Sequence, residues 1–202
     1  MVNFRKLEDY DDIEKIATWI YSTDEFTFNI VFKNKINAIK ALKKLIQSDY
    51  INPYHRHFIT ICYSNNREEI HGIAVSFKGS DISIKNTYKA MKSTSCTNIP
   101  LIIIYLAICR FFASSIANED YYLGNLFVNP KHRHEGVGSK LVNKCKELAI
   151  TSNSNALLLD VEHEKEYLLD FYDKLGLKLD SENYHKIFGK IYGCYGLKYN
   201  LK

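Results

Sequence analysis

Residues 121–141 read YYLGNLFVNPKHRHEGVGSKL and decide the fold, because an apolar strand, a short basic turn and a helix start follow one another there. The first turn of a helix has backbone N–H groups without an internal partner, and the helix dipole adds about half a positive charge. Gly136 and Gly138 remove Cβ atoms that would keep a phosphate from those amides, and Lys131 and Arg133 add positive charge. This order predicts an anion-binding site. The alternative is an ordinary strand, turn and helix whose glycines only allow tight packing.

Two well-known phosphate motifs do not fit this segment. A dinucleotide-binding fingerprint needs a third glycine where this chain has Leu141. A P-loop ends in Gly-Lys-Ser/Thr, whereas the order here is Gly138-Ser139-Lys140. The predicted anion site is therefore neither a dinucleotide-binding fingerprint nor a P-loop.

The segment resembles the acetyl-CoA-binding motif of the GNAT superfamily of N-acetyltransferases, Arg/Gln-x-x-Gly-x-Gly/Ala after a strand that ends near Val-x-Pro. Here the strand ends at Val128-Asn129-Pro130, and the motif runs from Arg133 to Gly138. Downstream, residues 156–161 (ALLLDV) look like the family's next strand, and residues 167–178 (YLLDFYDKLGLK) look like its following helix, which Gly176 would stop. The resemblance is close over about residues 121–181 and fades elsewhere.

The resemblance implies a GNAT-like α/β fold, with a mixed, mostly antiparallel central sheet of about seven strands flanked by helices. The residue pattern agrees, because strands alternate with helices along the chain. Strands are expected at residues 2–7, 58–63, 69–77, 121–128, 156–161, 177–179 and 194–201, and helices at residues 10–21, 37–46 (capped by Asn34) and 137–150.

With 202 residues, the chain suits a single GNAT-like domain over residues 1–202. Residues 81–120 have no counterpart in the minimal family plan, so we expect a helical insertion between the third and fourth strands, with helices at about 84–91 and 100–117. The insertion either shapes substrate choice or only adds packing. Its apolar run, residues 101–109, is far shorter than the roughly 20 residues that cross a bilayer. A buried helix is expected, and a membrane-surface or partner-binding helix is the alternative.

Composition limits the partners and the compartment. The net charge of +4 is not concentrated in a basic stripe, which speaks against nucleic acid. The five cysteines are widely spaced and odd in number, as is typical of reduced thiols, and residues 1–6 do not resemble a signal peptide, so a cytoplasmic protein is expected. No membrane partner is expected, and a homodimer is left open. Three histidines near the motif fit no metal-binding spacing, so no metal is expected: His132, His134 and His163.

The resemblance further implies transfer of an acetyl group from acetyl-CoA, as cosubstrate, directly to a primary amine of a small molecule or peptide. In this family the pantetheine arm lies where two neighbouring parallel strands part, here residues 125–128 and 157–161. The resemblance assigns contacts with the cosubstrate to ten residues: Leu126, Phe127, Val128, Arg133, His134, Glu135, Gly136, Val137, Gly138 and Ser139.

Tyr172 matches the family tyrosine that donates a proton to the leaving sulfur. A phenol with a pKa near 10 stays protonated at neutral pH and can act as a general acid. Because Phe171 is adjacent, only one of the two rings can face the sheet. The alternative for Tyr172 is a half-buried aromatic without a chemical role.

The general base has no clear assignment. In the histone-modifying branch of the family, a glutamate occupies the position of Tyr122. The candidates elsewhere are Glu162, Asp24 and Glu25, each of which can also be an ordinary surface acid, and a chain of waters can replace a base. Lys165 stands where many relatives have an asparagine that contacts the cosubstrate.

Two functions without catalysis remain open at this stage. One is an acyl-CoA-binding sensor, in which Tyr122 marks lost chemistry. The other is an interaction protein that presents residues 99–116 to a partner.

Overall fold

The computed structural model describes residues 2–64, 69–94, 114–187 and 190–202, with the side chains of 185–187 and 190–192 left aside. The predicted second inserted helix falls mostly outside the described residues, and its last four residues, 114–117, are not helical. The first inserted helix is confirmed as α4 (Ile84–Ser93), whose N-terminus is capped by the Ser83 side chain. No helix among the described residues is long and apolar enough to cross a membrane.

The described strands form one seven-stranded sheet, in the order β1-β2-β3-β4-β5-β7-β6. Only β4 and β5 are parallel, and every other neighbouring pair is antiparallel. The expected mixed, mostly antiparallel GNAT-like sheet is thus confirmed. Its strands are β1 (Asn3–Lys6), β2 (Ile59–Tyr63), β3 (Ile70–Lys78), β4 (Tyr121–Val128), β5 (Ala156–Glu162), β6 (Lys178–Ile187) and β7 (Lys190–Asn200).

The parallel strands β4 and β5 part soon after they begin. Their pairing is confined to Tyr121 with Leu157 and Tyr122 with Leu158. In the neighbouring pair, the register between β3 and β4 shifts so that Gly124 has no partner on β3. Such a bulge bends its strand and increases the local twist. The bend at Gly124 therefore lies where β4 leaves β5.

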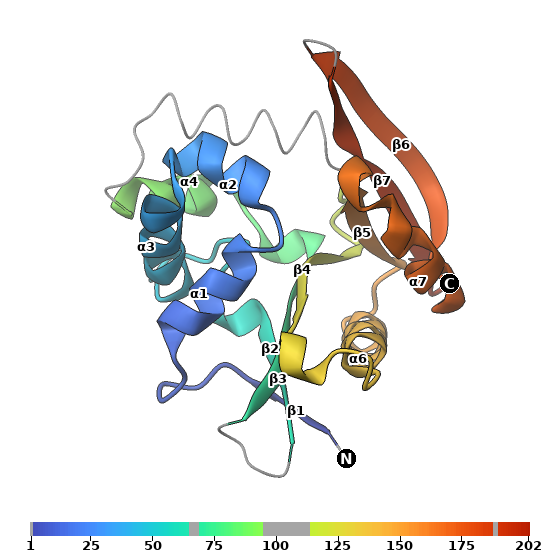
Figure 1. Ribbon diagram of the computed structural model, residues 1–202, viewed down its shortest axis with the longest axis horizontal. Helices are drawn as coiled ribbons and strands as arrows, with labels where there is room; N and C mark the ends of the chain where they lie inside the picture. Colours follow the sequence, from blue (N-terminus) through green and yellow to red (C-terminus); the bar gives the residue numbers. More distant parts are fainter. Residues whose placement is uncertain (1, 65–68, 95–113, 188–189) are drawn as a thin grey trace.

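Helices cover both faces of the sheet, with α1 to α4 on one side and α6 on the other (Figure 1). Alternate residues of β3 account for this, because successive strand residues point to opposite faces. Ile73 and Val75 belong to the core with the helices of the first side, whereas Ala74 belongs to the core with α6. The remaining helices are α1 (Ile13–Tyr21), α2 (Glu25–Phe32), α3 (Lys35–Ile46), α6 (Val137–Thr151) and α7 (Leu169–Lys174), and the short 3-10 helices are η1 (Arg56–Phe58), η2 (Gly79–Asp81), η3 (Pro130–His132) and η4 (His163–Leu168).

The sequence pattern did not predict α2. Its residues, EFTFNIVF, include aromatic and β-branched types that favour strands. The helix forms because the Asp24 carboxylate accepts the backbone N–H of Thr27 at its start. Phe28, Val31 and Phe32, spaced three and four residues apart, are buried in the core.

The closing hairpin is longer than expected. Strand β6 continues from Lys178 to Ile187, whereas only residues 177–179 were predicted, and Figure 1 shows β6 and β7 rising together beyond the rest of the sheet. The prediction was too short because β6 (KLDSENYHKI) is mostly polar. Its pairing with β7 provides the order that its apolar content does not.

Candidate active site

A cavity of about 1240 Å³ lies where β4 and β5 part. Its walls come from the turn after α1, both parted strands, the start of α6, the segment from η4 to α7, and parts of the described insertion, residues 82–87 and 114–118. Nine of the ten residues predicted to contact the cosubstrate line it: Leu126, Phe127, Val128, Arg133, His134, Gly136, Val137, Gly138 and Ser139. Glu135 is the tenth, and its carboxylate lies 3.2 Å from His132 Nδ1 instead.

The start of α6 leaves backbone donors facing this cavity. The residue before the helix, Gly136, has a left-handed backbone with φ of 74°. The backbone N–H of Lys140 donates to the carbonyl of Gly136, so the three preceding amides have no helical acceptor. Those amides belong to Val137, Gly138 and Ser139, which all line the cavity.

The two glycines of the motif serve different purposes. A Cβ at Gly136 would meet no atom within 4 Å, so its left-handed φ is what favours glycine there. A Cβ at Gly138 would lie 3.3 Å from Cζ of Phe171. Gly138 therefore permits close packing of α7 on α6 and also leaves the first-turn amides open.

Tyr172 lines the cavity from α7 and is only 7% exposed. Burial, with a smaller contribution from the Cys145 thiol, raises the pKa of its phenol above the ordinary value of 10. Within the described part of the chain, the phenol has no hydrogen-bond partner. Phe171 also lines the cavity, but it is less buried than Tyr172. Tyr172 is therefore a protonated group that faces the cavity and packs against the sheet.

Two of the three acids proposed as a general base come together in the cavity wall. Glu162, at the end of β5, forms an ion pair of 2.8 Å with Lys165 Nζ. Lys165 Nζ also donates to the backbone oxygen of Thr23 at 2.6 Å, beside Asp24. Burial and the charge of Asp24 raise the pKa of Glu162, although Lys165 opposes the shift. Glu25 does not line the cavity, and its carboxylate lies 3.5 Å from the Tyr21 phenol.

Asp160 is a further acid in the cavity that the sequence analysis did not single out. The Tyr122 phenol donates to its Oδ2 at 2.8 Å, and the Ser114 hydroxyl donates to its Oδ1 at 2.6 Å. Burial raises the pKa of Asp160, and these hydrogen bonds oppose the shift. An acid within the otherwise apolar run ALLLDV was the available signal.

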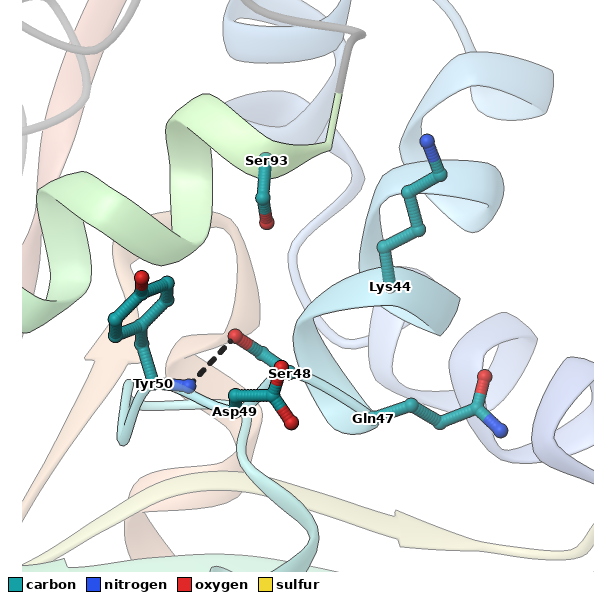
Figure 2. Close-up of a pocket in the computed structure, with 6 residues that line it drawn as sticks. All are labelled: Lys44, Gln47, Ser48, Asp49, Tyr50 and Ser93. Atoms are coloured by element: carbon teal, nitrogen blue, oxygen red, sulfur yellow. Dashed lines mark hydrogen bonds between the residues drawn. The ribbon is translucent and has the colours of Figure 1, made fainter.

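A smaller hollow of about 280 Å³ lies beside the end of α3 (Figure 2). Ser48 Oγ accepts the backbone N–H of Tyr50 there, and the Lys44 side chain points away from Tyr50 toward the backbone oxygen of Thr94, to which it donates. None of the six residues that line this hollow lines the large cavity. The candidate binding and catalytic residues described above therefore line the same large cavity, and the small hollow is separate from it.

Residues 101–177 match the family described as "Acetyltransferase (GNAT) family". A thialysine N-epsilon-acetyltransferase of Bos taurus is 30% identical over 77 residues, which make up 37% of this chain and 45% of the relative. The chain thus spans less than half the length of the curated relatives it matches.

Solved structures share the fold over almost the whole chain. An acetyltransferase crystal structure has a TM-score of 0.68 at 19% identity, covering 99% of this chain and 100% of the other. An N-acetyltransferase from Staphylococcus aureus Mu50 has a TM-score of 0.67 at 17% identity, covering 98% of this chain and 100% of the other. A chain of the NatC complex bound to a Gag peptide and CoA has a TM-score of 0.55 at 13% identity, covering 100% and 99%. Residues 101–177 therefore match the GNAT acetyltransferase family in sequence, and almost the whole chain shares its fold with solved acetyltransferases.

Proposed function

We propose that this protein transfers an acetyl group from acetyl-CoA to a primary amine of a small molecule or peptide. One observation carries the proposal: first-turn amides of a helix, a buried tyrosine and a pair of acids all line the cavity between the parted strands β4 and β5. An N-acetyltransferase needs a binding site for the CoA diphosphate, a proton donor and a proton acceptor, all in one cavity.

The α6 end of the cavity fits the diphosphate of a CoA thioester. The amides of Val137, Gly138 and Ser139 have no helical acceptor, and Arg133 adds a positive charge at the same wall. The helix dipole favours an anion at this end. The parted strands offer backbone groups at Leu126 and Val128, beyond the last β4–β5 pair, to an extended arm. Acetyl-CoA, when bound, would supply the activated acyl thioester.

Glu162 is our choice of general base. Its raised pKa suits a group that must accept a proton near neutral pH. Asp160 already accepts hydrogen bonds from Tyr122 and from both donors of Ser114, so its lone pairs are largely occupied. Glu162 contacts Lys165 and Asp24, so the two acids and the lysine form one group in the cavity wall that can take up a proton.

Tyr172 is our choice of general acid. Its raised pKa keeps a proton on Oη, which the phenol would donate to the departing sulfur. Its burial also excludes water from that end of the cavity. After the transfer, burial would destabilise the Tyr172 phenolate, so this residue must be reprotonated quickly.

The acceptor amine is proposed to be the end of a flexible chain. Asp24 and Glu162 would attract its ammonium form, and the relative from Bos taurus is named for acetylating the epsilon nitrogen of thialysine. The matched segment, residues 101–177, includes β4, β5 and most of the cavity wall. Thialysine, lysine and diamines are therefore the first acceptors to test.

The experiment is steady-state release of free thiol from acetyl-CoA with a panel of thialysine, lysine, diamines, aminoglycosides and lysine-containing peptides. We expect acceptor-dependent release with at least one amine. An acyl-CoA-binding sensor, which the absence of a carboxylate at Tyr122 favours, would bind acetyl-CoA in calorimetry and release no thiol with any acceptor. Failure to bind acetyl-CoA at millimolar concentration would contradict both functions.

A further inference from the structure

A second group of polar side chains lies beside the turn that leads into α6. It contains Glu69, just before β3, His71 on β3, and His132 at the end of η3. One ligand atom from each of these residues lies within 4.8 Å of the other two. The carboxylate of Glu135 lies on the other side of the His132 ring, 3.2 Å from Nδ1. We call Glu69, His71 and His132 the His71 cluster.

His71 is the unusual member of the cluster. Its side chain is only 6% exposed, and within the described part of the chain neither ring nitrogen has a hydrogen-bond partner. Buried polar groups in proteins are almost always paired, so an unpaired buried imidazole points to a missing partner. An imidazole binds a metal ion through the lone pair of its unprotonated ring nitrogen, so His71 offers one ligand atom to an ion at this place.

The geometry of the backbone brings the cluster together. Glu69 and His71 are two residues apart at the start of an extended strand, so their side chains leave the same face. The backbone N–H of Asn129 donates to the carbonyl of His71 at 2.8 Å, which fixes the η3 turn against β3. His132 then lies over His71, with ring centroids 3.6 Å apart and planes 5° apart. Glu69 Oε1 is 3.5 Å from His132 Nε2.

Two imidazoles and a carboxylate form a ligand set that zinc and its neighbours in the transition series prefer. The usual partners of a buried imidazole, a backbone oxygen that accepts or a hydroxyl group that donates or accepts, do not reach His71 among the described residues. We propose that Glu69, His71 and His132 bind a divalent transition-metal ion, with zinc as the best match.

Binding requires one local rearrangement. A metal ion lies in the plane of each imidazole that binds it, and the two rings are now parallel and stacked. Rotation of the His132 ring, which is attached to a surface turn, brings its nitrogen toward the His71 plane. The ion would then fasten β3 to the turn that precedes α6, next to Arg133.

The test is zinc titration of the protein, purified without a polyhistidine tag, by calorimetry together with metal analysis after dialysis. We expect one ion per chain. His71→Gln and His132→Gln should each weaken zinc binding by more than about tenfold. Even substitution of a residue that only hydrogen-bonds to a metal ligand commonly costs that much affinity. His134→Gln is the matched control, because His134 is exposed in the same turn and lies outside the His71 cluster. Its affinity for zinc should be unchanged.

Two further measurements cover a failure of His71→Gln to fold. Glu69 is exposed, so Glu69→Gln leaves the core intact and should still weaken zinc binding. Cobalt added to the unmodified protein should give the intense visible absorption of a tetrahedral site, and magnesium should not compete with it. Less than one zinc ion per chain, or binding that survives both Glu69→Gln and His132→Gln, would overturn the proposal.

Discussion

The Tyr122 phenol donates a hydrogen bond of 2.8 Å to Asp160 Oδ2, across the point where β4 and β5 separate. The Asp160 carboxylate lies on β5, and the Tyr122 phenol on β4 holds it in place in the cavity wall. The two parted strands thus supply this acid and its partner together.

Tyr122→Phe should lower the free energy of unfolding by about 1–3 kcal/mol, because it removes one donor from a buried carboxylate and leaves the ring in place. Urea denaturation followed by circular dichroism would measure the change. Tyr167→Phe is the control, since Tyr167 is 75% exposed, and it should shift the value by less than about 0.5 kcal/mol. Equal effects of the two changes would show that the hydrogen bond to Asp160 adds nothing.

Tyr172→Phe should lower kcat by about 10²–10⁴-fold while the dissociation constant for acetyl-CoA stays the same, because only the proton donor is removed. Single-turnover kinetics and calorimetry give the two quantities separately. Tyr184→Phe, on the exposed face of β6, should leave both unchanged. An unchanged kcat in Tyr172→Phe would remove this residue from the mechanism.

Gly138→Val should weaken acetyl-CoA binding by at least about tenfold, since the valine side chain would crowd the first-turn amides and press on Phe171.

Gly136→Ala acts differently, because a Cβ at this position has room but the φ of 74° does not suit alanine. We expect a loss of about 1–2 kcal/mol in stability from that change.

Gly136→Asn is the companion to Gly136→Ala, since asparagine tolerates the left-handed region better. It should recover part of the lost stability. Acetyl-CoA affinity would be measured by calorimetry, and stability by denaturation. If Gly138→Val bound acetyl-CoA normally, the helix start would not be the anion site.

The pH dependence of kcat/KM should report Glu162. A base works only when deprotonated, and the pKa of Glu162 is raised above its ordinary value of 4.5. The rate constant should therefore rise with pH through that raised pKa and level off above it. Glu162→Gln should lower kcat/KM and abolish this rise. Glu25→Gln, outside the cavity, should keep the profile, and a profile common to all three proteins would exclude Glu162 as the base.

The sequence predicted those parts of the site that lie in one continuous stretch. Strand β4, the turn before α6, α6, β5 and Tyr172 follow one another from residue 121 to residue 174, and the resemblance to the family's motifs was enough to predict them as one site. Glu162 and Asp24 were two of the candidate bases, and both line the cavity. Their meeting depends on Lys165 reaching Thr23, which is 142 residues away along the chain.

Other features depend on register and packing, which residue patterns do not specify. The Tyr122–Asp160 hydrogen bond requires the pairing of Tyr122 with Leu158, two residues before Asp160. Helix α2 requires a core that accepts Phe28 and Phe32. Likewise, no sequence spacing suggests that His71 and His132 lie together, because they are joined through the backbone of Asn129.

Strand β3 has two sets of side chains, one on each face of the sheet, that can be changed separately. Ile73 and Val75 belong to the core with α1 to α4, whereas Gly72 and Ala74 face α6. Within residues 72–75, changes at the odd positions would thus act on the packing of the first helical layer, and changes at the even positions on the packing of α6. A library restricted to one of these two sets would repack one face of the sheet and leave the other unchanged.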